Sequence, residues 1–107
     1  MKALAAPAAM LLCALLAAPP AAAQQDLAAR SLAATCANCH GTDGRARGEV
    51  MKPLAGMPAE RLLTLMAGYR SGSEPATVMQ QIARGYSDAQ LRLIAAYFAA
   101  VRPAPPR

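Results

Sequence analysis

Cys36-Ala37-Asn38-Cys39-His40 is the stretch of this sequence on which the interpretation of the rest depends. The two thiols are three residues apart, on one helical turn, and this spacing allows both to form thioether bonds with the vinyl groups of one porphyrin. The next residue, His40, would then lie beneath the iron and supply one axial ligand. The run predicts one covalently attached haem c per chain, held by Cys36 and Cys39 and bound at its iron by His40.

A Cys-x-x-Cys pair also occurs in redox dithiols, zinc sites and simple disulfides. A structural zinc site needs about four protein ligands. The chain has no histidine besides His40, and the only further cysteine is Cys13, near the N-terminus. A thioredoxin-like dithiol would be expected within a βαβ pattern, which the sequence does not contain. Haem attachment is therefore favoured over these alternatives.

The first 23 residues have the features of a secretory signal peptide. Lys2 precedes an apolar run, and a series of small residues ends at Ala23. Prolines interrupt the run, and it falls short of the roughly 20 apolar residues that span a membrane, so a retained anchor is the weaker alternative. Lipid attachment at Cys13 is weaker still, because the preceding Leu12 is not small. We therefore expect residues 1–23 to be removed and the mature chain to be periplasmic, without a membrane span.

Residues 24–107 are too few for more than one domain, with a proline-rich tail at 103–107. So small a chain buries little apolar surface, and a covalently bound macrocycle would supply part of its core. The apoprotein should therefore fold poorly. The whole chain has a formal net charge of +5 and 4% aromatic residues, which does not favour a nucleic-acid partner.

Helical periodicity and capping signals predict an all-α fold in which the first and last helices cross. The first predicted helix has Asp26 at its start, and the last begins at Ser87, with Gln90 completing a capping box. The glycine-rich segment 41–56 is predicted as a loop around one haem edge. The predicted helices cover 26–36, 58–70, 76–84 and the residues from Ser87 to just before Pro103.

These features resemble the class I c-type cytochromes, which likewise have an N-terminal helix ending in Cys-x-x-Cys-His, a haem-covering loop and a C-terminal helix with an aromatic pair. Within that family the sequence resembles the cytochrome subunits of flavocytochrome c sulfide dehydrogenases over about residues 30–101. The run 75–79 is the most specific part of the likeness and the haem motif the least. The resemblance implies a small class I cytochrome c fold with the haem in its core. The segments that carry it are 42–44, 54–56, 75–79, 82–83, 85–88 and 93–98.

Met79 is predicted to be the second axial ligand of the haem iron. Met66 falls on an apolar helical face and is favoured as a core residue. Met51 and Met57 flank the loop after His40, on the expected proximal side, whereas Met79 lies in a short segment on the far side. The resemblance places the family's ligand at the same position. Open or alternative ligation is the other possibility, and His/Met ligation would raise the reduction potential.

The proximal loop departs from the family pattern at Pro53. Many class I cytochromes have a proline whose carbonyl accepts a hydrogen bond from the proximal histidine, with another residue between it and Leu-x-Gly. Here Pro53 directly precedes Leu54. Either the loop is shifted, with Pro53 still the contact, or Lys52 contributes the carbonyl that orients the imidazole.

Three functions are compatible with this sequence. The resemblance implies an electron-transfer subunit that forms a heterodimer with a sulfide-oxidising FAD flavoprotein and passes electrons to a soluble acceptor, without being an enzyme by itself. A free diffusing periplasmic carrier cytochrome is the alternative. A haem enzyme or gas sensor would need an open iron position and usually a distal polar residue, and the lack of a second histidine argues against much of that chemistry. The resemblance favours the first function.

The intact mass of the exported protein tests the motif and the signal peptide together. In a host competent for haem maturation, we expect one added haem on a chain that starts near Gln24. A mature chain without added haem would contradict the interpretation of Cys36 to His40. A full-length chain in the membrane fraction would instead favour the anchor.

Overall fold

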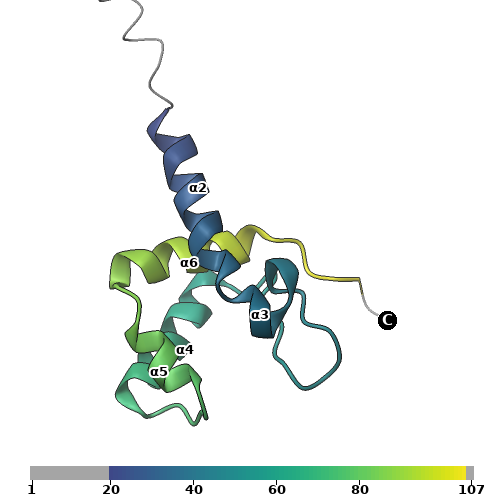
Figure 1. Cartoon of the computed structure of the whole chain (residues 1–107), viewed down its shortest axis with the longest axis vertical. Coiled ribbons are helices and arrows are strands. Elements are labelled where there is room, and N and C mark those ends of the chain that lie inside the picture. Colours follow the sequence, from purple (N-terminus) through teal and green to yellow (C-terminus); the bar gives the residue numbers. More distant parts are fainter. Residues whose placement is uncertain (1–19, 106–107) are drawn as a thin grey trace, which may run out of the picture.

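The computed structural model describes residues 20–105, and within that range every regular element is a helix (Figure 1). This confirms the all-α prediction. Most of the predicted signal peptide, 1–23, and the end of the tail, 106–107, lie outside the described residues. No helix within residues 20–105 has the length and apolarity needed to cross a membrane. The elements are α2 (Ala21–Ala34), α3 (Ala37–His40), the 3₁₀ turn η1 (Thr42–Gly44), α4 (Ala59–Ser71), α5 (Met79–Arg84) and α6 (Asp88–Ala100).

α4 and α6 begin close to where their capping signals predict, whereas α5 begins at Met79, later than the predicted start at 76. α4 starts directly after Pro58. At α6 the capping box is complete: the Gln90 backbone N–H donates to Ser87 Oγ over 3.2 Å, and the Ser87 N–H donates to Gln90 Oε1 over 2.8 Å. These reciprocal bonds satisfy backbone donors that have no partner inside the helix, which explains why the helix starts there.

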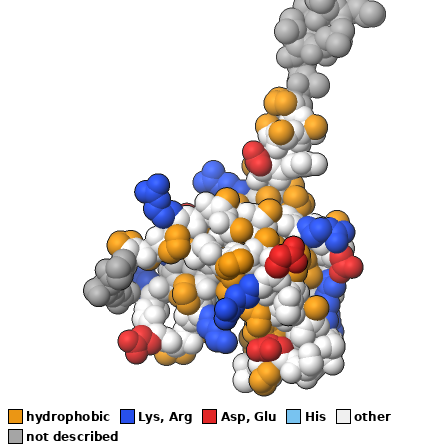
Figure 2. All heavy atoms as spheres, turned by 180° about the vertical axis from the view of Figure 1, so that it is seen from behind, with side chains coloured by type: hydrophobic (Ala, Val, Ile, Leu, Met, Phe, Trp, Pro, Cys, Tyr) orange, Lys and Arg blue, Asp and Glu red, His pale blue; other side chains and the backbone are white. Residues whose placement is uncertain are grey.

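The first helix differs from the prediction at both ends. α2 begins at Ala21, so Asp26 is not in its first turn. The acidic residue indicates a later start, but the alanines before it are strong helix formers and continue the helix back to Pro20. Its first turns project from the body, as Figure 2 shows from behind, and Leu27 is 66% exposed there. At the other end Thr35 Oγ1 donates to the Leu32 carbonyl over 2.7 Å, and the chain turns before it re-enters a helix as α3.

The predicted crossing of the first and last helices is present. α2 runs across α6 in Figure 1, and this pair is the main contact of α2. The buried side chains of α2 at the crossing are Ala29 and Ala33, which are small enough to let the helix axes approach closely. Phe98 of α6 is the largest fully buried side chain among the described residues. α4 and α5 complete the core from the other side with Leu62, Met66 and Ala83.

The loop after α3 is folded back onto this core at Gly44. Its carbonyl accepts hydrogen bonds from the backbone N–H groups of Leu54 and Ala55, over 2.9 and 3.2 Å, which closes the loop. Gly44 has a φ of 72°, and a β-carbon there would lie 2.8 Å from both Leu54 Cβ and Phe98 Cε1. Both the backbone conformation and the space therefore require glycine at this position.

Replacing Gly44 by Ala should lower the free energy of unfolding by about 3 kcal/mol, since left-handed strain and overpacking add. Gly48 is the matched control, because its φ is 76° and a β-carbon added there would have no atom within 4 Å. Gly48→Ala should therefore cost only about 1 kcal/mol. Denaturant unfolding of the haem-loaded proteins measures both. Equal losses would show that crowding against Phe98 does not matter.

Candidate haem site

A cavity of about 460 Å³ opens between α3, the loop that follows it, α4 and α5. Its lining is predominantly apolar, with contributions from Leu62 and Leu65 of α4 and from Ile94 of α6. Both α3 and α5, which lie well apart in Figure 1, contribute residues to the lining. The volume falls within the range of small-molecule and cofactor sites, about 300–1,000 Å³.

All three chemically important residues of the Cys-x-x-Cys-His run line this cavity. Cys36 is half-buried and Cys39 exposed, and no disulfide joins them. Burial raises the pKa of the Cys36 thiol, a shift that the neighbouring Thr35 hydroxyl opposes. α3 is a single turn in which the His40 N–H donates to the Cys36 carbonyl over 2.9 Å. This turn brings both sulfur atoms and the imidazole to one wall of one cavity.

The imidazole of His40 is held by a backbone carbonyl. Its Nδ1 lies 2.7 Å from the Lys52 oxygen. Because a carbonyl only accepts, Nδ1 carries the proton, and Nε2 keeps its lone pair available for a metal. This arrangement is typical of histidines that ligate metals.

The structure decides between the two residues that the sequence leaves open for this contact. Lys52 supplies the carbonyl and lines the cavity, while Pro53 is not among the lining residues. The acceptor of the His40 hydrogen bond is therefore Lys52, and a haem contact of Pro53 stays a prediction. Pro53 directly precedes Leu54, and the acceptor is the carbonyl of the residue before Pro53.

Four methionines line the cavity: Met51, Met57, Met66 and Met79. Met66 also belongs to the core, where it is 8% exposed, as the sequence predicts. Met51 directly precedes the residue that holds His40, and so lies on the proximal side. Met79, the first residue of α5, reaches the cavity from the separate segment between α4 and α6. Lining alone does not select one of the four. Met79 differs from Met66 in being only partly buried, and from Met51 and Met57 in lying outside the loop that follows α3.

Two side-chain contacts that the sequence did not predict join distant segments of the chain, and the first of them lies at the cavity. Thr35 and Tyr86, 51 residues apart, both line it, and their hydroxyl oxygens are 2.6 Å apart. On the loop side, Tyr97 of α6 donates to Asp43 Oδ1 over 2.6 Å. This hydrogen bond, with partial burial and the Asp43 charge, raises the pKa of the Tyr97 phenol. Neither pair has a sequence signature, because each joins residues that only the fold brings together.

The mouth of the cavity carries exposed apolar side chains. Val50 is 93% exposed, Val78 56% and Ile82 41%, and all three belong to the cavity lining. Large apolar residues that gather at one opening mark interaction sites more often than single scattered ones do. We refer to these three residues as the cavity mouth.

Within residues 20–105, no three His, Cys, Asp or Glu side chains come together as a metal-binding group. His40 is thus the nitrogen ligand that this site offers, and the donor set is two thiols, one imidazole and the methionine sulfurs. That set matches a haem, in which the porphyrin supplies the remaining ligands, better than it matches a bare metal ion.

No model of a known protein family matches the chain. Similar proteins include the cytochrome subunit of sulfide dehydrogenase from Chlorobaculum tepidum, 39% identical over 67 residues, which are 63% of this chain and 60% of that subunit. Cytochrome c-554(548) from Halomonas halodenitrificans is 37% identical over 67 residues, 60% of this chain and 81% of the relative. The thiosulfate dehydrogenase electron acceptor of Stutzerimonas stutzeri is 38% identical over 69 residues, 62% of this chain and 32% of the relative.

The chain therefore belongs to the c-type cytochromes. Its small all-helical architecture is that of class I, and the predicted likeness to the cytochrome subunit of a sulfide dehydrogenase is confirmed. The chain spans about 60% of the length of that subunit.

Proposed function

We propose that this chain is a periplasmic monohaem cytochrome c that accepts electrons from a sulfide-oxidising FAD flavoprotein, as the electron-transfer subunit of a heterodimer. The observation that carries the haem assignment is the meeting of Cys36, Cys39 and His40 at one apolar cavity, with His40 oriented by the Lys52 carbonyl. Bound haem supplies reversible one-electron reduction of its iron. Cys36 and Cys39 would attach the macrocycle covalently, one per chain, and His40 would bind its iron.

Met79 is the second iron ligand in this proposal. Met79 lines the same cavity as His40 but belongs to α5, so its thioether would be a second ligand from a separate segment of the chain. A thioether ligand raises the potential of a haem, which suits an acceptor of electrons. A bound Met79 would also close the iron position that a haem enzyme or gas sensor needs open.

The partner assignment is supported by the relatives and by the cavity mouth. One relative is named as a subunit of sulfide dehydrogenase and another as the electron acceptor of thiosulfate dehydrogenase. Val50, Val78 and Ile82 give this chain an apolar surface beside the site where electrons would enter. A permanent interface is expected to be larger and more apolar than a transient redox contact, which usually buries less than about 1,200 Å². The signal peptide predicted for residues 1–23 supports a periplasmic location, and a soluble acceptor would take the electrons onward.

A free diffusing carrier is the second candidate. It is supported by the similarity to cytochrome c-554(548), whose name specifies no dehydrogenase. In that case the same haem site would serve several partners in turn, and each partner would dissociate quickly from the cavity mouth.

Replacing each of the four cavity methionines by Leu in turn should identify the ligand. Leu conserves the volume and usually costs less than about 1.5 kcal/mol, but it cannot bind iron. We expect only Met79→Leu to lose the sulfur-to-iron charge-transfer band, to lower the reduction potential and to bind carbon monoxide when reduced. Met51→Leu, Met57→Leu and Met66→Leu are the matched controls and should keep the band. If one of these controls loses the band instead, the methionine replaced in it is the ligand.

Affinity capture of this chain from native periplasm tests the partner. We expect a stable one-to-one complex with a yellow, FAD-containing protein, in which added sulfide reduces the haem. Val50→Lys at the cavity mouth should weaken the complex, because it places a charge in a desolvated interface. Leu27→Lys is the control, since Leu27 is 66% exposed on α2 and does not line the cavity. A monomer whose haem responds to sulfide no faster than the isolated recombinant protein would favour the free carrier.

A further inference from the structure

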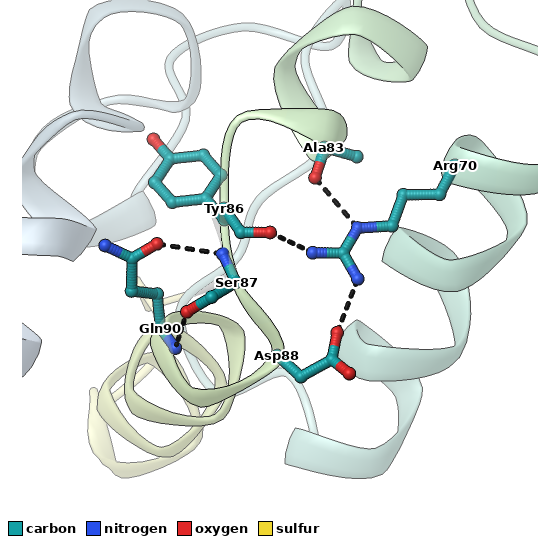
Figure 3. A network of polar contacts seen from close by, with 6 residues as sticks. All are labelled: Arg70, Ala83, Tyr86, Ser87, Asp88 and Gln90. Atoms are coloured by element: carbon teal, nitrogen blue, oxygen red, sulfur yellow. Dashed lines mark hydrogen bonds and ion pairs between the residues drawn. The ribbon is translucent and has the colours of Figure 1, made fainter.

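Arg70, in the last turn of α4, donates hydrogen bonds to three acceptors around the end of α5 and the start of α6 (Figure 3). Its Nε donates to the Ala83 carbonyl over 3.0 Å. One terminal nitrogen donates to the Tyr86 carbonyl, and the other lies 2.5 Å from Asp88 Oδ1. A single guanidinium therefore joins α4 to the end of α5, to the turn after it and to the start of α6.

The Ala83 carbonyl is an acceptor that needs this partner. Ala83 is in the last turn of α5, where carbonyls find no N–H donor further along the helix, and the residue is 0% exposed. A carbonyl that is both buried and left without a donor is costly. The planar guanidinium can serve Ala83 and the nearby Tyr86 carbonyl at once, because its N–H groups have a fixed fork geometry.

α5 depends on such external contacts for its position. The helix has only six residues, and helices this short are not stable on their own. Met79 and Ala83 are four residues apart, so they lie on the same face, one turn from each other. Fixing the carbonyl of Ala83 against α4 therefore also fixes how far Met79 extends into the cavity.

Tyr86 receives a second anchor on the other side. Arg70 holds its backbone carbonyl, while its hydroxyl contacts Thr35, the residue before Cys36. The segment from Met79 to Tyr86 is thereby connected to α4 through Arg70 and to the haem-attachment turn through Thr35. One connection thus runs to α4 and the other to the residue before the haem-attachment turn.

We propose that Arg70 is a positioning residue for the Met79 ligand, acting through the Ala83 and Tyr86 carbonyls to hold α5 at the distance that Met79 ligation requires. This inference rests on the proposed role of Met79. Arg70 does not line the cavity itself, and so acts only through the segment it holds.

The ion pair with Asp88 is the lesser part of this contact. The Asp88 side chain is 73% exposed, and exposed pairs contribute little because water screens them. Arg70, through its hydrogen bond and its charge, lowers the pKa of the Asp88 carboxyl. The two carbonyl contacts are partly buried and carry the positioning.

Imidazole binding to the oxidised holoprotein tests the proposal, since imidazole can reach the iron only when Met79 leaves it. The titration is monitored through the loss of the sulfur-to-iron charge-transfer band. Arg70→Met should raise the apparent affinity for imidazole about tenfold or more. This factor is expected because the departure of Met79 from the iron no longer breaks a hydrogen bond from the charged Arg70 side chain. Arg70→Lys should fall between Arg70→Met and wild type, because an ammonium cannot serve both carbonyls with the same geometry.

Three variants separate positioning from charge and from general stability. Asp88→Asn removes the ion pair, and Arg61→Met removes a positive charge from an exposed position on the same helix, α4. Both should leave imidazole affinity within about twofold of wild type. Leu91→Ala removes a buried core side chain that does not line the haem cavity. It should lower the denaturation midpoint without raising imidazole affinity.

The outcomes separate the positioning role of Arg70 from the ligand role of Met79. If Met79→Leu abolishes the band but Arg70→Met binds imidazole as wild type does, Arg70 has no positioning role. If Leu91→Ala raises imidazole affinity as much as Arg70→Met, the effect is general destabilisation and the inference is again overturned. If the wild-type band does not depend on Met79, both the ligand role and the positioning role are wrong.

Discussion

The structure of this chain depends on a cavity that its own side chains leave open. Four of the buried apolar residues among those described are alanines, so the helices pack closely where they cross but supply little bulk to fill the space between them. A chain this small buries a limited share of its apolar surface, which leaves a narrow margin over the entropy of ordering. A macrocycle attached to Cys36 and Cys39 would occupy the missing part of the core. Folding and haem attachment would therefore be coupled energetically, because the haem would fill the space between the helices.

Much of this arrangement is predictable from the sequence because it rests on local chemistry. The Ser87 and Gln90 side chains define the start of α6 by bonding backbone groups three residues away, and Pro58 defines the start of α4 in a similarly local way. The Cys36-to-His40 run brings its functional groups to one cavity wall for the same reason, since one helical turn is enough to do so. The start of α2 is the exception. There the helical preference of a run of alanines, which extends to Pro20, outweighs the signal of a single acidic residue.

Individual hydrogen bonds between distant segments were not predictable, and in the site most of them end on backbone carbonyls. His40 is oriented by the carbonyl of Lys52, and Arg70 binds the carbonyls of Ala83 and Tyr86. Every residue has a carbonyl, so the sequence does not mark which one accepts the bond. This is why a departure from the family pattern at Pro53 left two residues open, and why nothing in the sequence distinguished Arg70 from the other basic residues of the chain.

Backbone acceptors also explain how the site can keep its geometry while side chains around it vary. The Lys52 side chain is not the group that holds His40, so its identity is free as long as the loop carries a carbonyl to the same place. That place is set by the closure of the loop on Gly44, whose backbone, without a β-carbon, fits between Leu54 and Phe98. On the other wall, Arg70 sets the place of α5. The two proposed iron ligands are thus held by independent backbone contacts, one through the packed glycine of the loop and one through a guanidinium on α4, and each can be perturbed without directly touching the other.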